Sequence, residues 1–508
     1  MAASRKTVAA SGMRPRVDWQ IAVALSAGFF LYYLAFTHGK FSGTDEVSLY
    51  LTTQALYENG DLAIAPIRNT HPGRDGRRYF ECGVGQAVLA LPLYAAAKLA
   101  RRTLPDAWVR ALAGPRDVLK VEGEYAAVFG GELEIFLVGL YAPMASALLV
   151  GIFYLLERRL GVSATAALIS SALLGACTYA ATMSTYFLRH TSETLTVLAA
   201  LYAFTVYRET GNPRVLALGS VVASLTVLIR VPGVIAGPGL ALYLACCVRE
   251  RLRTHGGGLA RLFAAVVLPS TALAAMHFWL HYARWGTWIA SPQVSTAMDR
   301  ATPLYVGLWG FLFSPGISVF AYSPLLLLLP WTFPLLWARC RTLGAVILLM
   351  VTCYLLVFAG NRWWTGLWSA PGPRYVFPVG VFLMLPLGLW IDRGLTWRRL
   401  AALSVLGFAG LCAQLALMTA SWGATVGLSN YGQYGPDFSF VFVPQASPIL
   451  TSARTALAGY IDLWLLDLYL GWPGQPGYPA VARGCALGLL IALVVVVIWL
   501  RRLMRSIA

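Results

Sequence analysis

Apolar runs recur along this chain from residue 20 to residue 500, and they constrain its fold more than any other feature. Each run has roughly 17 to 25 residues, which is long enough for a helix to cross about 30 Å of hydrocarbon. Of the 508 residues, 58% are hydrophobic and only 12% are charged, whereas soluble domains carry about 25% charged residues. The sequence therefore predicts an all-α polytopic membrane protein and excludes a soluble enzyme.

Charged residues punctuate the apolar runs and divide them into about twelve transmembrane helices. The predicted spans lie near 20–37, 133–156, 163–185, 191–207, 214–229, 234–248, 262–282, 318–337, 343–360, 375–391, 400–420 and 483–500. The basic arm before the first span could also describe a signal peptide, but the length of the stretch and the lack of a small-x-small cleavage site favour a signal anchor. The apolar stretch 84–99 would make a thirteenth span and would then place every later basic connector on the opposite side. We therefore interpret it as an interfacial helix in the first outer loop.

These boundaries divide the chain into four parts. Residues 1–19 form a cytosolic arm, 20–420 a transmembrane catalytic bundle, 421–482 an outer segment, and 483–508 the last span with a cytosolic tail. Two further long outer loops, 38–132 and 283–317, lie within the bundle region. Loops held by a rigid scaffold often carry function, so we expect the chemistry on this side.

The net charge of +17 reflects orientation in the membrane rather than a nucleic-acid partner. The arm, the tail and the connectors of one side hold 20 of the 39 Lys and Arg residues but only 5 of the 22 Asp and Glu residues. By the positive-inside rule this side faces the cytosol. We therefore expect both termini in the cytosol and the active site on the extracytoplasmic side of the plasma (inner) membrane.

Two adjacent carboxylates, Asp45 and Glu46, follow the first span by a few residues. A carboxylate at the mouth of a span raises the free energy of the folded protein unless it is exposed to water or has a functional role. One interpretation is helix capping, with Thr44 as N-cap and the acids in the first turn. The other makes one carboxylate a general base that takes a proton from an acceptor hydroxyl or amine. The residue pattern leaves both interpretations open.

Four segments of the chain carry a family resemblance. They read "SLYLTTQALYENGDLAI" after the acidic pair, "YFECGVGQAVLALPLYA", "FLFSPGISVFAYSPLLLLLP" and "WWTGLWSAPGPRYVFPV". With the acidic pair, they resemble GT-C glycosyltransferases that use polyprenyl-phosphate sugars, a group that includes protein O-mannosyltransferases and lipid A aminoarabinose transferases. Segments 68–73 and 98–124 match no pattern of that group, so the acceptor stays open.

The resemblance implies a helical bundle with an outer cavity, a polyprenyl-phosphate sugar donor and inversion at the anomeric carbon. The acceptor would be an extracytoplasmic glycan, lipid or protein of the bacterial cell envelope. Asp45 would be the catalytic base, with Glu46 in support. Related transferases divide on metal use, so the resemblance assigns no cofactor and leaves a divalent cation open.

A lipid-phosphate donor keeps its tail in the bilayer and its sugar phosphate at the outer interface, where cations must stabilise the leaving phosphate. Outer-side arginines are candidates because the guanidinium offers planar donors to phosphate. The predicted donor-phosphate residues are Arg374, Tyr375, Arg189, His190, Arg362 and Arg78. Each of these arginines, and Arg230 as well, could equally be an interfacial anchor.

Aromatic residues concentrate toward the outer side, where interfacial belts explain most of them. Aromatic faces also stack on sugars, so Trp363, Trp364 and Trp368 are predicted to line the acceptor groove. His277 and His281 have the i, i+4 spacing of a helical metal pair, but their aromatic surroundings favour a belt role. No clear DxD motif is present in the sequence, and we assign no metal ligand.

The alternative function is a lipid-linked sugar transporter or flippase without transferase chemistry. Such a protein would need a similar basic and aromatic cavity but no general base. Charges in mid-span are sparse and paired broken helices are not evident in the sequence, which argues against coupled transport.

Overall fold

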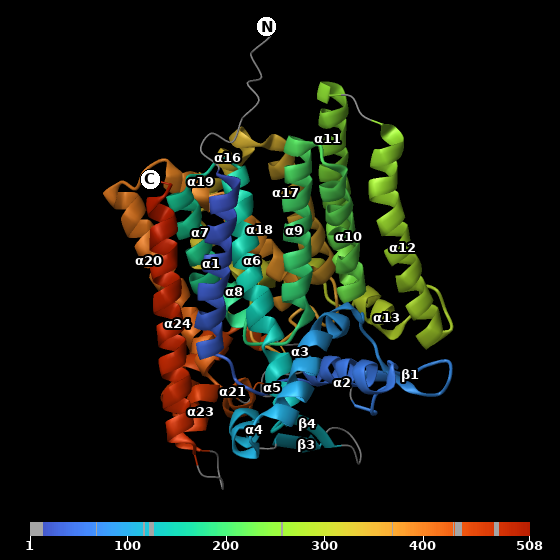
Figure 1. Ribbon diagram of the computed structural model, residues 1–508, viewed down its shortest axis with the longest axis vertical. Helices are drawn as coiled ribbons and strands as arrows, with labels where there is room; N and C mark the ends of the chain where they lie inside the picture. Colours follow the sequence, from blue (N-terminus) through green and yellow to red (C-terminus); the bar gives the residue numbers. More distant parts are fainter. Residues whose placement is uncertain are drawn as a thin grey trace.

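The computed structural model describes residues 14–67, 69–114, 117–120, 126–255, 258–367, 369–429, 431, 439–471 and 477–507. Most of its helices run side by side in one bundle (Figure 1). They are α1 (Pro15–Ala35), α6 (Tyr141–Arg159), α7 (Ala164–Cys177), α9 (Arg189–Thr210), α10 (Pro213–Ile229), α11 (Gly237–His255), α12 (Leu259–Trp285), α16 (Leu329–Arg339), α17 (Arg341–Ala359), α18 (Phe377–Met384), α19 (Leu387–Asp392), α20 (Trp397–Thr419) and α24 (Pro479–Arg505).

The helices coincide with the predicted spans. Within the described ranges, eight segments are each long and apolar enough to cross a membrane, and shorter apolar helices cover the predicted spans near 163–185, 214–229 and 318–337. The twelfth span is α9, whose first turn carries buried polar residues that lower its hydropathy. The chain is thus a multi-pass membrane protein, and the predicted fold class is confirmed.

The two ends of the bundle differ. The start of α1 and the end of α24 lie at the same end (Figure 1), where the Arg14 guanidinium donates to the carbonyl of Ser506. At this end Arg339 Nε donates to the Leu160 carbonyl at 2.8 Å, and Arg159 forms an ion pair with Glu209. The basic connectors therefore share one end, as the charge pattern predicts.

The first outer loop folds over the opposite end, which we call the outer end (Figure 1). It contains α2 (Thr44–Asn59), α3 (Gly85–Thr103), α4 (Asp106–Ala113), α5 (Leu133–Gly139) and two hairpins, β1 (Thr70–Pro72) with β2 (Arg78–Phe80) and β3 (Asp117–Lys120) with β4 (Ala126–Gly130). The stretch 84–99 is the interfacial helix α3, as expected. The two antiparallel hairpins are the departure from an all-α description.

Short elements lie at the outer end and at points where the bundle helices are interrupted. They are α8 (Tyr179–Met183), α13 (Pro292–Met298), α14 (Leu304–Phe313), α15 (Val319–Tyr322), α21 (Trp422–Ser429), α22 (Pro448–Leu457), α23 (Trp464–Leu470), and the 3-10 turns η1 (Val231–Ala236), η2 (Pro324–Leu328), η3 (Arg374–Val376), η5 (Ser439–Phe442) and η6 (Pro444–Ala446). Proline stands at the first or second position of α13, α22, η1, η2 and η6, where its missing N–H costs no helical hydrogen bond.

Close backbone contact fixes the first outer loop on the bundle. A Cβ atom on Gly85 would lie 2.7 Å from the backbone nitrogen of Ile229, and one on Gly83 would lie 2.4 Å from the carbonyl oxygen of Leu228. Only glycine permits this approach to the end of α10. The contact holds residues 81 and 82 against the ends of α9 and α10, where the candidate site lies.

Candidate active site

A cavity of about 570 Å³ lies at the outer end, between the first outer loop and the ends of the bundle helices. Its lining comes from segments far apart in the sequence. The lining residues are Lys40, Phe41, Ser42, Gly43, Thr44, Asp45, Asn69, Glu81, Cys82, Phe129, Arg189, His190, Arg230, Pro232, Gln293, Thr296, Phe358, Asn361, Trp363, Thr365, Gly366, Ser369, Arg374, Tyr375, Ser421, Gly423 and Asp462.

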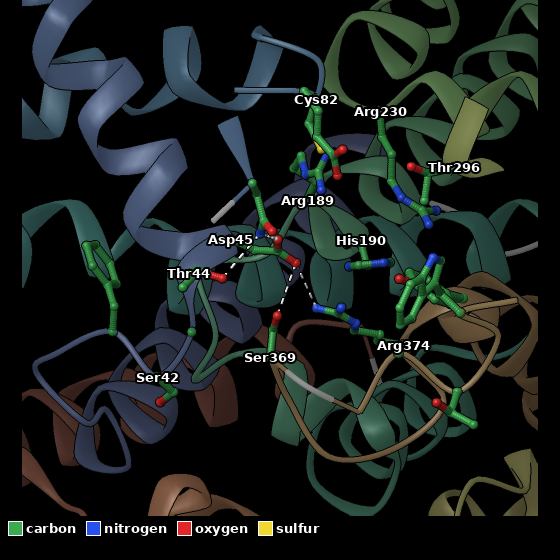
Figure 2. Close-up of a pocket in the computed structure, with 18 of the residues that line it drawn as sticks. Ser42, Thr44, Asp45, Cys82, Arg189, His190, Arg230, Thr296, Ser369 and Arg374 are labelled. Atoms are coloured by element: carbon green, nitrogen blue, oxygen red, sulfur yellow. Dashed lines mark hydrogen bonds and ion pairs between the residues drawn. The ribbon is translucent and has the colours of Figure 1, made fainter. Parts of the chain in front are cut away.

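Asp45 stands in the first turn of α2 and turns its carboxylate into the cavity (Figure 2). One oxygen, Oδ2, accepts from Ser369 Oγ at 3.1 Å and from Arg374 Nη1 at 3.2 Å, and the other accepts from the amide of Asn69. Burial raises the pKa of Asp45, but the cations of Arg374 and Arg189 and the Ser369 hydrogen bond together hold it below its usual value. The carboxylate is therefore ionised and already paired.

Glu46, the next residue, is 1% exposed and does not line the cavity. Its Oε2 accepts from the backbone N–H groups of Ser42 and Gly43 at 2.8 and 3.1 Å, and its Oε1 accepts from that of Phe187 at 2.6 Å. Burial raises the pKa of this carboxyl to about 7, against the opposing effect of those three donors. Glu46 thus caps α2 and ties it to the segment that leads into α9. This placement fits the predicted supporting role of Glu46. It does not fit direct contact between Glu46 and a reacting atom.

Arg374 reaches the cavity from η3, at the mouth of α18. Gly372, two residues earlier, has φ +91°, and a Cβ atom there would come within 2.5 Å of the Tyr322 ring, so the turn requires glycine. The Arg374 side chain is 5% exposed. Its Nε is buried and finds no hydrogen-bond partner among the described residues. Arg374 thus has donor capacity beyond its pairing with Asp45.

Arg189 and His190 open α9 and face the same cavity (Figure 2). The Arg189 guanidinium lies over the Phe80 ring, 5.3 Å from its centroid. In the described part of the chain, Arg189 Nε and Nη1 and both His190 ring nitrogens are buried without a hydrogen-bond partner. The His190 ring packs against Tyr375 at 5.5 Å. Unsatisfied buried donors are costly, so this cluster is suited to an anion.

A further guanidinium, that of Arg230, completes the basic wall at the end of α10. Arg230 Nη1 lies 2.6 Å from Glu193 Oε2, and Glu193 Oε1 accepts from the Tyr354 hydroxyl at 2.7 Å. The Arg230 guanidinium also lies over the rings of Phe358 and Tyr375, at 5.1 and 5.4 Å from their centroids. The cavity therefore gathers three buried guanidinium groups on the side that Asp45 faces, and the carboxylates of Glu81 and Asp462 also line it.

Solved structures of known proteins include ones with a similar architecture. No family model matches the chain, and no curated protein matches it. Among solved structures, ArnT from Cupriavidus metallidurans bound to undecaprenyl phosphate is similar with a TM-score of 0.50 and 14% identity, over 86% of this chain and 77% of that chain. ArnT is a lipid A aminoarabinose transferase and a GT-C glycosyltransferase. The chain has the GT-C fold. The Archaeoglobus fulgidus oligosaccharyltransferase in the apo form matches with a TM-score of 0.45 and 12% identity, over 90% of this chain and 58% of that chain.

Besides Glu46, three of the predicted donor and acceptor residues lie outside the cavity lining. Arg78 donates to Thr70 Oγ1 at 3.0 Å and to the Thr70 carbonyl at 2.6 Å, so it braces the β1–β2 hairpin. Arg362 pairs with Asp299 at 2.8 Å, and its side chain is 57% exposed. Trp364 is buried in the core against Phe311. The geometry gives no support to their predicted contacts with donor or acceptor.

The other predicted site residues lie as follows. Arg374, Tyr375, Arg189, His190, Asp45 and Trp363 all line the cavity, and Trp368 lies outside the described residues. Within the described ranges, no group of three His, Cys, Asp or Glu side chains could hold a metal ion.

The sequence analysis did not place Arg230 among the cavity residues. The available signal was Glu193, a glutamate inside a predicted span, because a carboxylate there needs a partner. Lys40 and Asp462 were also not predicted as site residues, although both line the cavity from two different loops.

Proposed function

We propose that the chain is an integral-membrane glycosyltransferase that moves a sugar from a polyprenyl-phosphate donor to an extracytoplasmic acceptor, with inversion. One observation carries the proposal: the Asp45 carboxylate shares a cavity with the guanidinium groups of Arg189 and Arg374, which keep buried nitrogens without a partner among the described residues. The transferred group is a hexosyl or pentosyl unit. The GT-C fold supports the proposal as an analogy.

In this mechanism the donor phosphate oxygens accept from the free N–H groups of Arg189 and Arg374. The acceptor oxygen or nitrogen forms a bond to the anomeric carbon while the bond from that carbon to the phosphate oxygen breaks. Asp45 takes the acceptor proton, and the polyprenyl phosphate leaves with its electron pair and negative charge held by the arginines. Attack opposite the leaving group inverts the anomeric carbon.

The position of the cavity suits a lipid-linked donor. The outer end is the end that lacks the basic connectors, and by the positive-inside rule this supports our proposal of an extracytoplasmic active site in the plasma (inner) membrane. A donor whose tail stays in the bilayer would present its phosphate at this depth. Undecaprenyl phosphate, which the ArnT structure contains, is the probe that follows from the comparison.

The test is transfer by purified protein in lipid nanodiscs, with a panel of radiolabelled polyprenyl-phosphate sugars and a membrane extract as acceptor source. Wild-type protein should transfer label from at least one donor. Asp45→Asn should lower turnover by roughly 10²- to 10⁴-fold, the usual contribution of a general base. Asp106→Asn, an equivalent change on exposed helix α4, should transfer like wild type.

Two results would contradict the proposal. Near-wild-type transfer by the Asp45→Asn protein would show that Asp45 is not the general base. Binding of donors with movement across the bilayer, but without any transfer, would instead support a lipid-linked sugar transporter or flippase.

A further inference from the structure

The cavity has a second polar wall that the donor chemistry does not use, formed by Lys40, Ser421 and Asp462. We propose that this wall is the acceptor subsite and that it recognises a neutral carbohydrate through its hydroxyl groups. The inference rests on the proposed transferase function and names the acceptor class for the same cavity. A carbohydrate here would meet Asp45 from the side away from the arginines.

Backbone hydrogen bonds between three distant segments build this wall. Asp462 N donates to the Thr419 carbonyl at 2.8 Å, and Ser421 N donates to the Tyr460 carbonyl at 3.1 Å. Trp464 N, just beyond Asp462, donates to the Thr37 carbonyl at 2.9 Å. The segments leaving α1, leaving α20 and entering α23 are thereby fixed to one another, so the wall is preformed.

Asp462 has unused hydrogen-bonding capacity. The residue is 4% exposed, and its Oδ1 accepts no hydrogen bond from the described residues, although Lys40 Nζ lies 3.5 Å away. A buried carboxylate oxygen without a donor is unfavourable. Hydroxyl groups of a carbohydrate could donate to Asp462, while the Lys40 ammonium, whose side chain is 32% exposed, could donate to their oxygens.

The two walls differ in their polar groups. The donor wall holds the guanidinium groups of Arg189, Arg230 and Arg374 with the carboxylates of Asp45 and Glu193, and Glu81 also lines the cavity and acts electrostatically on Arg189. Its buried guanidinium nitrogens without a partner among the described residues suit this wall to a phosphate. At the second wall Lys40 and Asp462 are matched one to one. A neutral polyhydroxyl ligand keeps that balance, whereas an anionic acceptor would face the Asp462 carboxylate.

The arrangement also gives the attack a direction. Figure 2 shows Ser42 on the opposite side of Asp45 from Arg230 and Thr296. Lys40 precedes Ser42 by two residues in the same loop and lines the same cavity. An acceptor held by Lys40 and Asp462 would therefore approach the donor sugar past Asp45, with the leaving phosphate at the far side, as inversion requires.

The test uses the full chain in nanodiscs and two kinds of probe. Saturation-transfer NMR with a panel of methyl glycosides and short neutral oligosaccharides measures binding at the second wall. Titration with undecaprenyl phosphate measures binding at the donor wall. Asp462→Asn and the more exposed Lys40→Met should each weaken binding of the best glycoside by roughly tenfold. Both should leave the undecaprenyl phosphate Kd within about twofold, and Asp106→Asn should change neither.

The outcomes are distinct. Wild-type protein that binds none of the glycosides overturns the inference, and so does a glycoside affinity unchanged in both variants. Binding of a serine- or threonine-containing peptide that requires Asp462, with no glycoside bound, would replace the carbohydrate by a protein acceptor and also overturn it. Asp462-dependent glycoside binding by a protein that fails to bind undecaprenyl phosphate would support the subsite while refuting the donor of the proposed function. If the Asp462→Asn protein does not fold, the glycoside affinity of the Lys40→Met protein decides between these outcomes.

Discussion

Removing the Asp45 carboxylate should tighten the binding of the phosphate lipid while it lowers turnover. Arg374 Nη1 lies 3.2 Å from Asp45 Oδ2, so a donor phosphate must compete with Asp45 for that guanidinium. At this separation the Coulomb attraction is about 5 kcal/mol for an effective dielectric constant near 20. Desolvation offsets most of it, and a hydrogen bond between charged groups contributes a net of about 1.5–3 kcal/mol.

Asp45→Asn removes this competition and also the repulsion between the carboxylate and the phosphate. It leaves Arg374 buried with an uncompensated charge, which the phosphate then neutralises. The Kd for undecaprenyl phosphate should therefore fall by roughly tenfold or more. Turnover in the same variant should fall by roughly 10²- to 10⁴-fold.

The assay is calorimetric titration of undecaprenyl phosphate into wild-type, Asp45→Asn and Asp106→Asn protein in nanodiscs, with turnover measured on the same preparations. Opposite changes in affinity and turnover are the expected signature. A Kd for Asp45→Asn that equals or exceeds the wild-type value would refute the argument that Asp45 and the phosphate share Arg374. The Asp106→Asn protein controls for a general effect of losing one carboxylate at the outer end.

Further expectations concern the residues around Asp45. Arg189→Gln should raise the Kd for undecaprenyl phosphate by roughly tenfold or more, since its unpartnered nitrogens are donors to phosphate; an equal effect of the exposed Arg110→Gln would contradict this. Glu46→Gln turns an amide nitrogen toward backbone N–H groups and should lower the free energy of unfolding by about 1–3 kcal/mol, which an unchanged thermal midpoint would disprove. Because the folded-state pKa of Asp45 is lowered, its ionisation stabilises the fold above its unfolded pKa near 3.8 and this contribution is lost as pH falls through the lower folded value. The difference in unfolding midpoint between wild type and Asp45→Asn should therefore shrink only below about pH 4, and a difference that is constant down to pH 2 would exclude this linkage.

The sequence by itself determined the membrane bundle and the place of each span. A bilayer demands about 20 apolar residues per crossing helix and hydrogen-bonded backbone throughout, and both demands are local along the chain. The basic connectors are local signals as well, and the contacts of Arg159 with Glu209 and of Arg339 with Leu160 bring them to one end. The interfacial helix α3 followed from the same reasoning, because a thirteenth span would have broken the charge pattern.

Only the tertiary structure decided which polar side chains share the cavity. Asp45 and Glu46 are adjacent, but successive side chains on a helix point about 100° apart, so one faces the cavity and the other caps α2. Arg362 and Arg374 leave the same connector, and only the second reaches Asp45. These outcomes depend on contacts between distant segments, such as Arg374 with Asp45, and no local pattern in a single sequence records which segments will meet.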